Sequence, residues 1–386
     1  MRQPFLTDRL QGFGNTIFGE MSALAVATGS VNLGQGFPDT DGPTEVLEAA
    51  VEAIRTGKGN QYPPALGIPE LRQRISEHQQ RFYGITVDPD SEVLVTAGAT
   101  EAIASALFSL LNSGDEVIAF EPFYDSYAAC ISMAGARRVP ITLRAPTYAL
   151  DEEAFRAAVS PRTKLILLNT PHNPTGKVFT PDELALIADV AIEHDLLVIS
   201  DEVYEHLVFD GVHTPICTLP GMWDRTVTIS SAGKVFSVTG WKVGWVTAPA
   251  ALVAAVRCSK QFLTYVSAGP FQYAAAVGLG LPDSYFTAYT EGLRAGRDLL
   301  CAGLAEAGFG VMIPQGTFFI TADIRPLGGI DGFDFCRELP HRAGVVAIPT
   351  QVFYDNVDAG RHLVRFAFCK KPAVLEEAVR RLGALS

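Results

Sequence analysis

The stretch Thr226-Val227-Thr228-Ile229-Ser230-Ser231-Ala232-Gly233-Lys234 decides how the fold is assigned. In it a β-rich apolar run meets a turn of small residues that ends in a lysine. Ligands of open α/β sheets bind outside the carboxyl ends of the strands, so residues that follow such runs are candidates for a functional site. A lysine there can lose solvation, which lowers the pKa of its amine and makes it a nucleophile toward carbonyl groups. Most lysines taken alone are solvated surface residues, so the assignment of Lys234 depends on partners elsewhere in the chain.

The same pattern of a short apolar run followed by a helix recurs from about residue 65 to residue 280. The expected strands are 92–96, 116–120, 164–168, 196–200, 226–229 and 243–247, and helical periodicity marks 99–111, 181–194 and 250–262. Most of the strand runs are continuously apolar, as strands buried on both faces are. Alternating strands and helices predict an α/β fold with a mostly parallel sheet between helices.

The pattern changes near residue 284. A long helical stretch at 285–308 is followed by a strand-like run at 316–321, a helix, and a second strand-like run at 362–368. These elements predict a smaller α+β domain joined by the long helix, and the first thirty residues are expected to pack on it. The expected division is a large ligand-binding domain, 31–283, and a small domain made of 1–30 and 284–386.

Composition restricts the classes of function. The chain has 386 residues, of which 48% are hydrophobic and 19% charged, so it can bury a large core and is not globally disordered. Its formal net charge of −12 argues against a general nucleic-acid or anionic-membrane binder, because the diffuse field repels phosphates. A local basic pocket for one phosphate remains compatible with this charge.

The cysteines and the first residues favour the cytoplasm. The six cysteines are widely spaced, with no CxxC pair and no Cys/His cluster of zinc spacing, so we expect reduced thiols and no metal site. The N-terminal residues lack the apolar core of a signal peptide. No apolar run approaches the ~18 residues that a membrane-spanning helix requires.

The turn after the first expected strand could bind an anion. Gly98, Ala99 and Thr100 open a helix, whose free backbone N–H groups and dipole favour negative charge. Judged alone, such a turn is more often an ordinary strand-to-helix connection. The Ser231 hydroxyl and the Lys242 ammonium group could reach the same anion.

Polar and aromatic residues follow three further strands. Tyr124 could stack on a planar ring, although core packing is the commoner fate of an aromatic residue. Asn173 lies in a turn that prolines make rigid, so its amide could be held at a fixed angle. Asp201 ends a buried strand and is followed by Tyr204, and the carboxylate needs either a cation, such as a protonated ring nitrogen, or the N–H groups of a helix that it caps.

Together these residues describe one ligand, with a phosphate, a flat ring, a ring nitrogen, a ring oxygen and an aldehyde. The phosphate would lie on Gly98–Thr100 with Ser231 and Lys242, the ring on Tyr124, the ring nitrogen on Asp201, the ring oxygen on Asn173 and Tyr204, and the aldehyde on Lys234. Pyridoxal 5′-phosphate has all of these groups, and proteins usually hold it through a lysine and an acid at the ring nitrogen.

At these residues the chain resembles the fold-type-I, class I aminotransferases. Within them it is most similar to the kynurenine/glutamine transaminase branch and to actinobacterial enzymes assigned as N-succinyldiaminopimelate aminotransferases. The matching segments are 31–39, 61–64, 121–127, 173–176, 201–204, 219–223, 231–245 and 363–366, which cover nearly the whole chain in the expected order.

The resemblance implies further roles. Tyr62 would reach the phosphate held by the neighbouring subunit, which implies a homodimer with shared active sites. Arg365 would hold the substrate α-carboxylate as a bidentate fork, and the Gly36 loop would close over the substrate next to Asn173. Phe18, Tyr265 and Phe353 correspond to side-chain-pocket positions.

One departure from the family pattern concerns specificity. Val266 stands where the kynurenine enzymes carry a histidine, which weakens a direct carry-over of an aromatic preference. The resemblance leaves succinyl-diaminopimelate, kynurenine, phenylalanine, glutamine and methionine as amino donors.

The implied reaction is ping-pong transamination between an L-amino acid and a 2-oxo acid. Lys234 would be both the covalent anchor of the cofactor and the proton carrier, with Asp201 and Tyr204 assisting. A cysteine-S-conjugate β-lyase would use the same residues. A non-enzymatic regulator of this fold would need a DNA-binding module for which we expect no room. A nucleotide-binding enzyme is disfavoured because the chain has no strand followed by GxGxxG and no GxxxxGK[ST].

Overall fold

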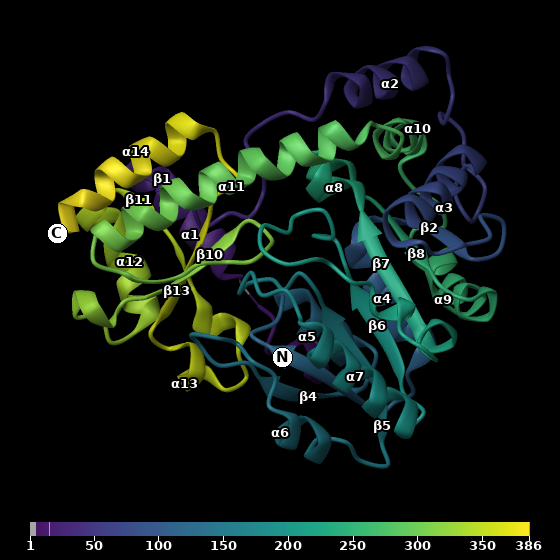
Figure 1. Ribbon diagram of the computed structural model, residues 1–386, viewed down its shortest axis with the longest axis horizontal. Coiled ribbons are helices and arrows are strands. Elements are labelled where there is room, and N and C mark those ends of the chain that lie inside the picture. The colour runs from purple at the N-terminus through teal and green to yellow at the C-terminus, as the bar shows by residue number, and fades with distance from the viewer. Residues whose placement is uncertain (1–4, 15, 386) are drawn as a thin grey trace.

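The computed structural model describes residues 5–14 and 16–385, and a seven-stranded sheet, here called the large sheet, lies at its centre (Figure 1). In spatial order its strands are β2 (Val93–Ala97), β8 (Val243–Thr247), β7 (Thr226–Ser231), β6 (Leu197–Asp201), β5 (Thr163–Asn169), β3 (Glu116–Glu121) and β4 (Arg137–Thr142). Only β8 runs antiparallel to its neighbours. All the other strands of this sheet therefore end at the same edge.

Helices cover both faces of the large sheet because its strands are apolar on both faces. The side chains alternate: Val117 and Leu165 belong to one core, and Ile118 and Ile166 to another. The first core is closed by α4 (Gly98–Leu110), α5 (Asp125–Met133) and α9 (Ala250–Leu263), and the second by α6 (Glu152–Ala157) and α7 (Pro181–Glu193). A third core joins β2 and β8 to α2 (Thr44–Arg55), α3 (Pro69–Tyr83) and α10 (Gly269–Leu279).

A second, smaller group of elements has its own core. Its four-stranded antiparallel sheet, the small sheet, has the order β12 (Ile348–Pro349), β13 (Leu363–Ala367), β10 (Phe319–Asp323) and β9 (Gly310–Met312). Around it lie α1 (Ile17–Thr28), α12 (Gly332–Ala343), α13 (Val357–Gly360), α14 (Pro372–Leu382) and a two-stranded pair, β1 (Val31–Asn32) with β11 (Val345–Val346). Leu33, directly after β1, also lies in this core.

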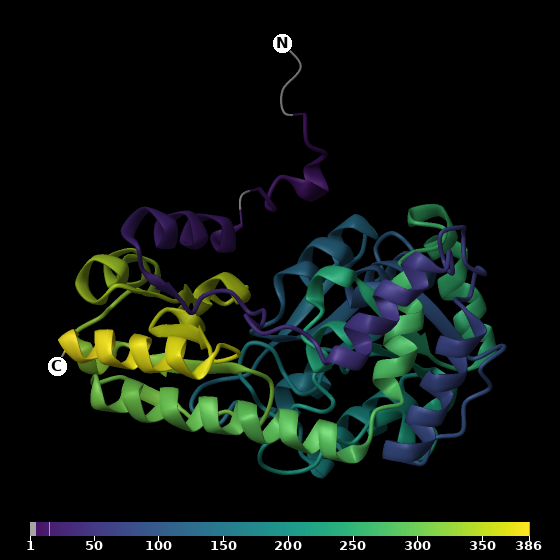
Figure 2. The same cartoon turned by 90° about the horizontal axis from the view of Figure 1, so that it is seen from above.

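The 24-residue helix α11 (Asp283–Glu306) connects the two groups (Figure 2). It begins beside the large sheet and ends against α14 and the small sheet. Short helices complete the chain: α8 (Ala232–Val235), and the 3-10 turns η1 (Asp8–Leu10), η2 (Ile216–Thr218), η3 (Trp223–Arg225), η4 (Thr239–Trp241), η5 (Arg325–Leu327), η6 (Thr350–Phe353) and η7 (Gly383–Leu385). Within the described ranges, none of the helices combines the length and apolarity needed to cross a membrane.

The expected α/β class is confirmed, and the six expected strands of the large sheet are present within one or two residues of their predicted ends. The edge strand β4 was not predicted. Arg137, Arg138 and Pro140 interrupt its apolar pattern, and an edge strand tolerates such residues because one side of its ladder is unpaired. The short strands β1, β9, β11 and β12 were not predicted either, because they are too brief to show a period.

Candidate active site

A cavity of about 290 Å³ lies at the edge of the large sheet where the parallel strands end, next to β13 of the small sheet. Its walls include thirteen of the residues expected at the site: Phe18, Gly36, Gly98, Ala99, Thr100, Tyr124, Asn173, Asp201, Tyr204, Ser231, Lys234, Lys242 and Arg365. The structure therefore brings residues from the ends of β2, β3, β5, β6 and β7 into one cavity. Tyr62, Tyr265 and Phe353 lie outside its lining.

Lys234 belongs to the four-residue helix α8, directly after β7. Its amine opens onto the cavity and lies 5.6 Å from the ring centre of Tyr204 and 5.3 Å from that of Phe318. Burial lowers the pKa of Lys234 to about 8, although Cys369 and Asp201 oppose the shift. An amine with this pKa is partly unprotonated near neutral pH, as a nucleophile toward carbonyls must be.

Asp201 is the last residue of β6 and is 4% exposed. Its Oδ2 accepts a hydrogen bond of 2.5 Å from the Tyr127 hydroxyl, and its Oδ1 accepts one of 3.3 Å from the Val203 amide. Burial raises the pKa of Asp201 to about 6, against these hydrogen bonds and the Lys234 charge. No helix begins at residues 202–206, so the alternative interpretation of Asp201 as a helix cap is wrong.

The expected anion turn forms the N-terminus of the 13-residue helix α4. Gly98 has a φ of +71°, and a Cβ there would lie 3.1 Å from the Lys242 amine, so glycine keeps this space open. The Lys242 amine donates to the Thr100 hydroxyl at 3.3 Å, and Ser231 ends the neighbouring strand β7. Backbone N–H groups, the helix dipole, a hydroxyl and an ammonium group thus converge, which is the donor set of a phosphate site.

Arg365 is a buried cation on the small sheet. It lies on β13, is 2% exposed, and forms no ion pair with the described residues. Its Nη1 donates to Asn173 Oδ1 at 3.2 Å and its Nη2 to the Gly34 carbonyl at 3.1 Å, while its Nε has no partner. Its guanidinium carbon is 4.0 Å from the centre of the Phe319 ring. Burial lowers the pKa of Arg365 to about 10, so it stays charged and its surroundings favour an incoming carboxylate.

Eleven further lining residues were not predicted from the sequence, among them Asn169, Tyr127 and Phe319. Asn169 ends β5; its Nδ2 donates to the Asp201 carbonyl at 2.8 Å, and its Oδ1 accepts from the Asn173 amide at 2.7 Å. A polar residue at the end of a buried strand was the available signal. Tyr127 and Phe319 also line the cavity, and their aromatic character alone does not separate them from core residues.

Tyr62 and Tyr265 lie on an open face of the chain, 80% and 49% exposed, with their ring centres 5.4 Å apart. Phe262, on the same segment as Tyr265, is 84% exposed. Phe353 is buried behind Arg365, and with Phe18 it lines a second cavity of about 450 Å³.

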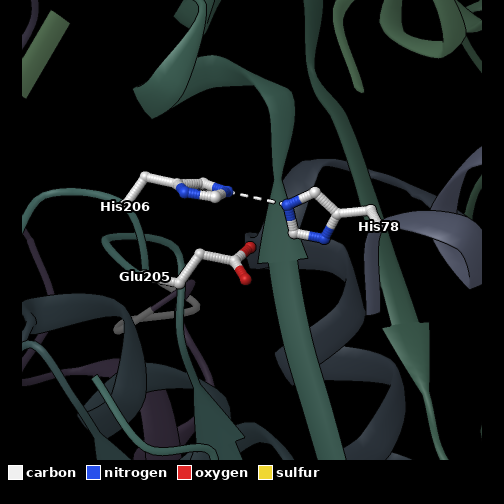
Figure 3. A group of neighbouring side chains, drawn as sticks. All are labelled: His78, Glu205 and His206. Atoms are coloured by element: carbon white, nitrogen blue, oxygen red, sulfur yellow. Dashed lines mark hydrogen bonds between the residues drawn. The ribbon is translucent and has the colours of Figure 1, made fainter. Parts of the chain in front are cut away.

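A separate polar cluster joins α3 to the segment that follows β6. In the described part of the chain, His78, Glu205 and His206 form a group whose ligand atoms lie within 4.8 Å of one another, as a metal site requires (Figure 3). The two Nε2 atoms share a hydrogen bond of 2.7 Å, and Glu205 accepts hydrogen bonds from Ser230 and Tyr83. His78 Nδ1 has no acceptor, whereas a ligating histidine normally donates its second N–H. These donors and acceptors describe a hydrogen-bonded network better than a metal site.

Known proteins are similar over the full length of the chain. The sequence profile of the family "Aminotransferase class I and II" matches residues 28–382. A probable N-succinyldiaminopimelate aminotransferase of Mycobacterium tuberculosis is 51% identical, over 98% of this chain and 98% of that protein. A kynurenine–oxoglutarate transaminase of Dictyostelium discoideum is 38% identical, over 95% and 93%. The solved structure of the N-succinyldiaminopimelate aminotransferase from Mycobacterium tuberculosis matches with a TM-score of 0.96 and 52% identity, covering 99% of this chain and all of that one.

Proposed function

The chain belongs to the class I and II aminotransferases, and from that premise we propose that it transfers amino groups with pyridoxal 5′-phosphate in the cavity at the edge of the large sheet. The observation that carries the proposal is the cavity itself. It presents a lysine of lowered pKa, a buried carboxylate of raised pKa and a buried arginine without an anion. Each of these three groups lacks a partner that the cofactor or an amino-acid substrate would supply.

The residues at the cavity fit the cofactor group by group. The open space at Gly98 beside Lys242, with Ser231 and Thr100, would take the phosphate. Asp201 would accept a hydrogen bond from the protonated ring nitrogen. Tyr124 would stack on the ring, and Asn173 and Tyr204 would bind the ring oxygen. A cation at the ring nitrogen would relieve the unfavourable burial of the Asp201 carboxylate.

The chain's own residues then have defined tasks. When bound, pyridoxal phosphate supplies an aldehyde carbon that bonds to amines and a ring that withdraws electrons from the substrate Cα. Lys234 would hold the cofactor through that carbon, and its amine would move the proton of the substrate Cα. Asp201 would hold the ring nitrogen in its protonated form, and the Tyr204 hydroxyl would donate a hydrogen bond to the ring oxygen. Arg365 fixes the substrate α-carboxylate, with Asn173 beside it. A second 2-oxo acid uses the same residues in reverse, which is the ping-pong scheme of this family.

The substrate pair to test first is N-succinyldiaminopimelate with 2-oxoglutarate, because relatives of about half-identical sequence carry that name. Kynurenine, glutamine, methionine and phenylalanine complete the panel of donors. Phe18 and Gly36 line the cavity beside Arg365 and would contact the substrate. Phe353 and Tyr265 lie outside the cavity lining of one subunit, and we propose that they border the substrate side chain from there. The β-lyase alternative is not favoured, since the relatives are named as aminotransferases.

The assembly that we propose is a cytoplasmic homodimer in which Tyr62 of one subunit contacts the phosphate in its partner. The exposure of Tyr62 and Tyr265, large aromatic residues on one face, supports this arrangement. All six cysteines are free thiols, as a reducing compartment maintains them. We also propose that 31–283 acts as the cofactor-binding domain and that 1–30 with 284–386 acts as the small domain.

The test is to load the purified protein with pyridoxal phosphate and reduce it with borohydride. We expect a yellow protein whose visible band disappears on reduction, with the cofactor attached to Lys234. Lys234→Ala should abolish turnover, whereas Lys164→Ala, at an exposed position on β5, should not change it. A colourless protein that takes up no cofactor would refute the proposal, and pyruvate and ammonia released without a 2-oxo acid acceptor would indicate a β-lyase.

A further inference from the structure

We propose that Tyr127 is a positioning residue for Asp201, which it holds ionised and correctly turned toward the ring nitrogen of the bound cofactor. The proposal rests on the function proposed above, because it concerns the same site. Tyr127 ends the matching segment 121–127 and lines the cavity.

The geometry around Tyr127 supports a single task for its hydroxyl group. Tyr127 lies in the first turn of α5, is 3% exposed, and its hydroxyl donates to Asp201 Oδ2 at 2.5 Å. A carboxylate only accepts hydrogen bonds, so Tyr127 is the donor whenever Asp201 is ionised. The ring of Tyr127 packs edge-on against Tyr124, with 5.8 Å between the ring centres. The same tyrosine thus contacts both the proposed stacking ring and the proposed partner of the ring nitrogen.

The Asp201 carboxylate needs such a partner for orientation. It can rotate about its Cβ–Cγ bond, a broad torsion that packing alone does not fix. Tyr127 holds Oδ2, and the Val203 amide approaches Oδ1 at 3.3 Å. With both oxygens held, the remaining lone pairs have one fixed direction toward the cavity that Asp201 lines.

The carboxylate also needs a donor to remain charged. Burial favours the neutral acid and the neighbouring Glu202 does the same, while Lys234 and the hydrogen bonds from Tyr127 and Val203 favour the carboxylate. If Asp201 became the stronger base, the shared proton would move from the ring nitrogen to the carboxylate. The ring would then lose the positive charge that withdraws electrons from the substrate.

The experiment compares Tyr127→Phe with Tyr148→Phe in the loaded enzyme. Tyr148 is also a buried tyrosine, but its hydroxyl contacts Met312 Sδ, at 3.4 Å, and Thr321, and it does not line the cavity. We expect Tyr127→Phe to lower kcat by about tenfold to a hundredfold, the range of a lost hydrogen bond to a charged group, with little change in KM. The acid limb of its pH–rate profile should move to higher pH. With ¹⁵N-labelled pyridoxal phosphate, the ring-nitrogen resonance should shift toward the unprotonated form.

Two further variants test whether Tyr127 acts through Asp201. In an Asp201→Asn background, Tyr127→Phe should have no additional effect on kcat or on the ¹⁵N signal, because residues acting as one unit are not additive. A fluorinated tyrosine at position 127, a stronger donor, should move the acid limb to lower pH. If Tyr127→Phe behaves like Tyr148→Phe, or if its effect persists in the Asp201→Asn background, the proposal is wrong. A wild-type protein that binds no cofactor would refute the proposed function instead.

Discussion

Two charged residues with opposite pKa shifts face one cavity in this protein. Burial lowers the pKa of Lys234 to about 8 and raises that of Asp201 to about 6, so both resist carrying their usual charge. At about 1.36 kcal/mol for each pKa unit, each group costs on the order of 3 kcal/mol when it is charged and no ligand is bound. A bound ligand with an aldehyde and a basic ring nitrogen, as we propose, would remove both costs.

Because burial of the Asp201 carboxylate is unfavourable, we expect Asp201→Asn to stabilise the cofactor-free protein, by an amount that depends on pH. The folded-state pKa lies above that of the unfolded chain, so the folded state binds more protons between about pH 4 and pH 6 and loses stability as pH rises through this window. The variant should therefore be more stable by up to about 3 kcal/mol at pH 8 and by less at pH 5. Urea unfolding at both pH values measures this. Asp224→Asn, at an exposed position, is the control, and an equal gain at both pH values would contradict the prediction.

At the scale of elements, α11 holds the turn that carries Lys234. Helix α8 has only four residues, so the carbonyl groups of Lys234 and Val235 have no partner within it. The Tyr289 hydroxyl donates to the Lys234 carbonyl at 2.9 Å, and the Tyr285 hydroxyl donates to the Val235 carbonyl at 2.7 Å. Because the far end of α11 packs against the small sheet, one helix links that sheet to the turn that carries Lys234.

This link predicts that Tyr289→Phe impairs the chemical step. The Lys234 carbonyl would lose its donor, at a cost of about 1–3 kcal/mol, and the lysine turn would lose one of its two supports. We expect lower stability, a kcat reduced by about tenfold and a KM for the amino donor within a factor of about two, since Arg365 is untouched. Tyr273→Phe removes a hydroxyl from a half-buried tyrosine of α10 and serves as the control. A variant whose KM alone changes would show that α11 acts on substrate binding instead.

At the scale of the whole molecule, Tyr62 lies outside the lining of the cavity in its own chain. Tyr62 is 80% exposed and contacts Tyr265 at the surface, whereas the turn at Gly98 lines the cavity. In the dimer that we propose, a second copy of the chain would bury this aromatic face and bring its own Tyr62 to that turn. In a C2 dimer each face meets its equivalent, so both sites would be completed at once.

Shared sites predict complementation between two defective chains. Tyr62→Ala and Lys234→Ala homodimers should each be impaired, but a mixed dimer contains one site with neither substitution. Random pairing of refolded subunits should then restore about a quarter of the wild-type activity per subunit, since half of the dimers would be mixed, with one intact site in each.

The control for complementation mixes Tyr204→Phe with Lys234→Ala. Both of these side chains line the cavity of their own subunit, so each site of a mixed dimer carries one substitution and mixing should restore no activity. If mixing Tyr62→Ala with Lys234→Ala likewise restores nothing, Tyr62 serves its own subunit and the shared site is wrong. Activity measured before and after joint refolding distinguishes the two outcomes.

The sequence by itself determined the class of the fold and most of the site, because both depend on local signals. Apolar runs such as 164–168 identify buried strands, and in parallel strands the residues that follow must meet at one edge. This rule alone predicts that Asp201, Ser231 and Lys234 lie together. The chemical groups of pyridoxal phosphate then identified one ligand that these residues could bind together.

Only the tertiary structure decided what depends on distance between segments remote in sequence. The order of the strands, the edge strand β4, the Tyr127–Asp201 hydrogen bond and the support of Lys234 by α11 leave no periodic signal in the chain. Lys234 shows the division most clearly. Its place after a strand is local and could be predicted, whereas its lowered pKa arises from burial by segments far apart in the sequence and from the charges of Arg365 and Lys242, against the opposing effects of Cys369 and Asp201.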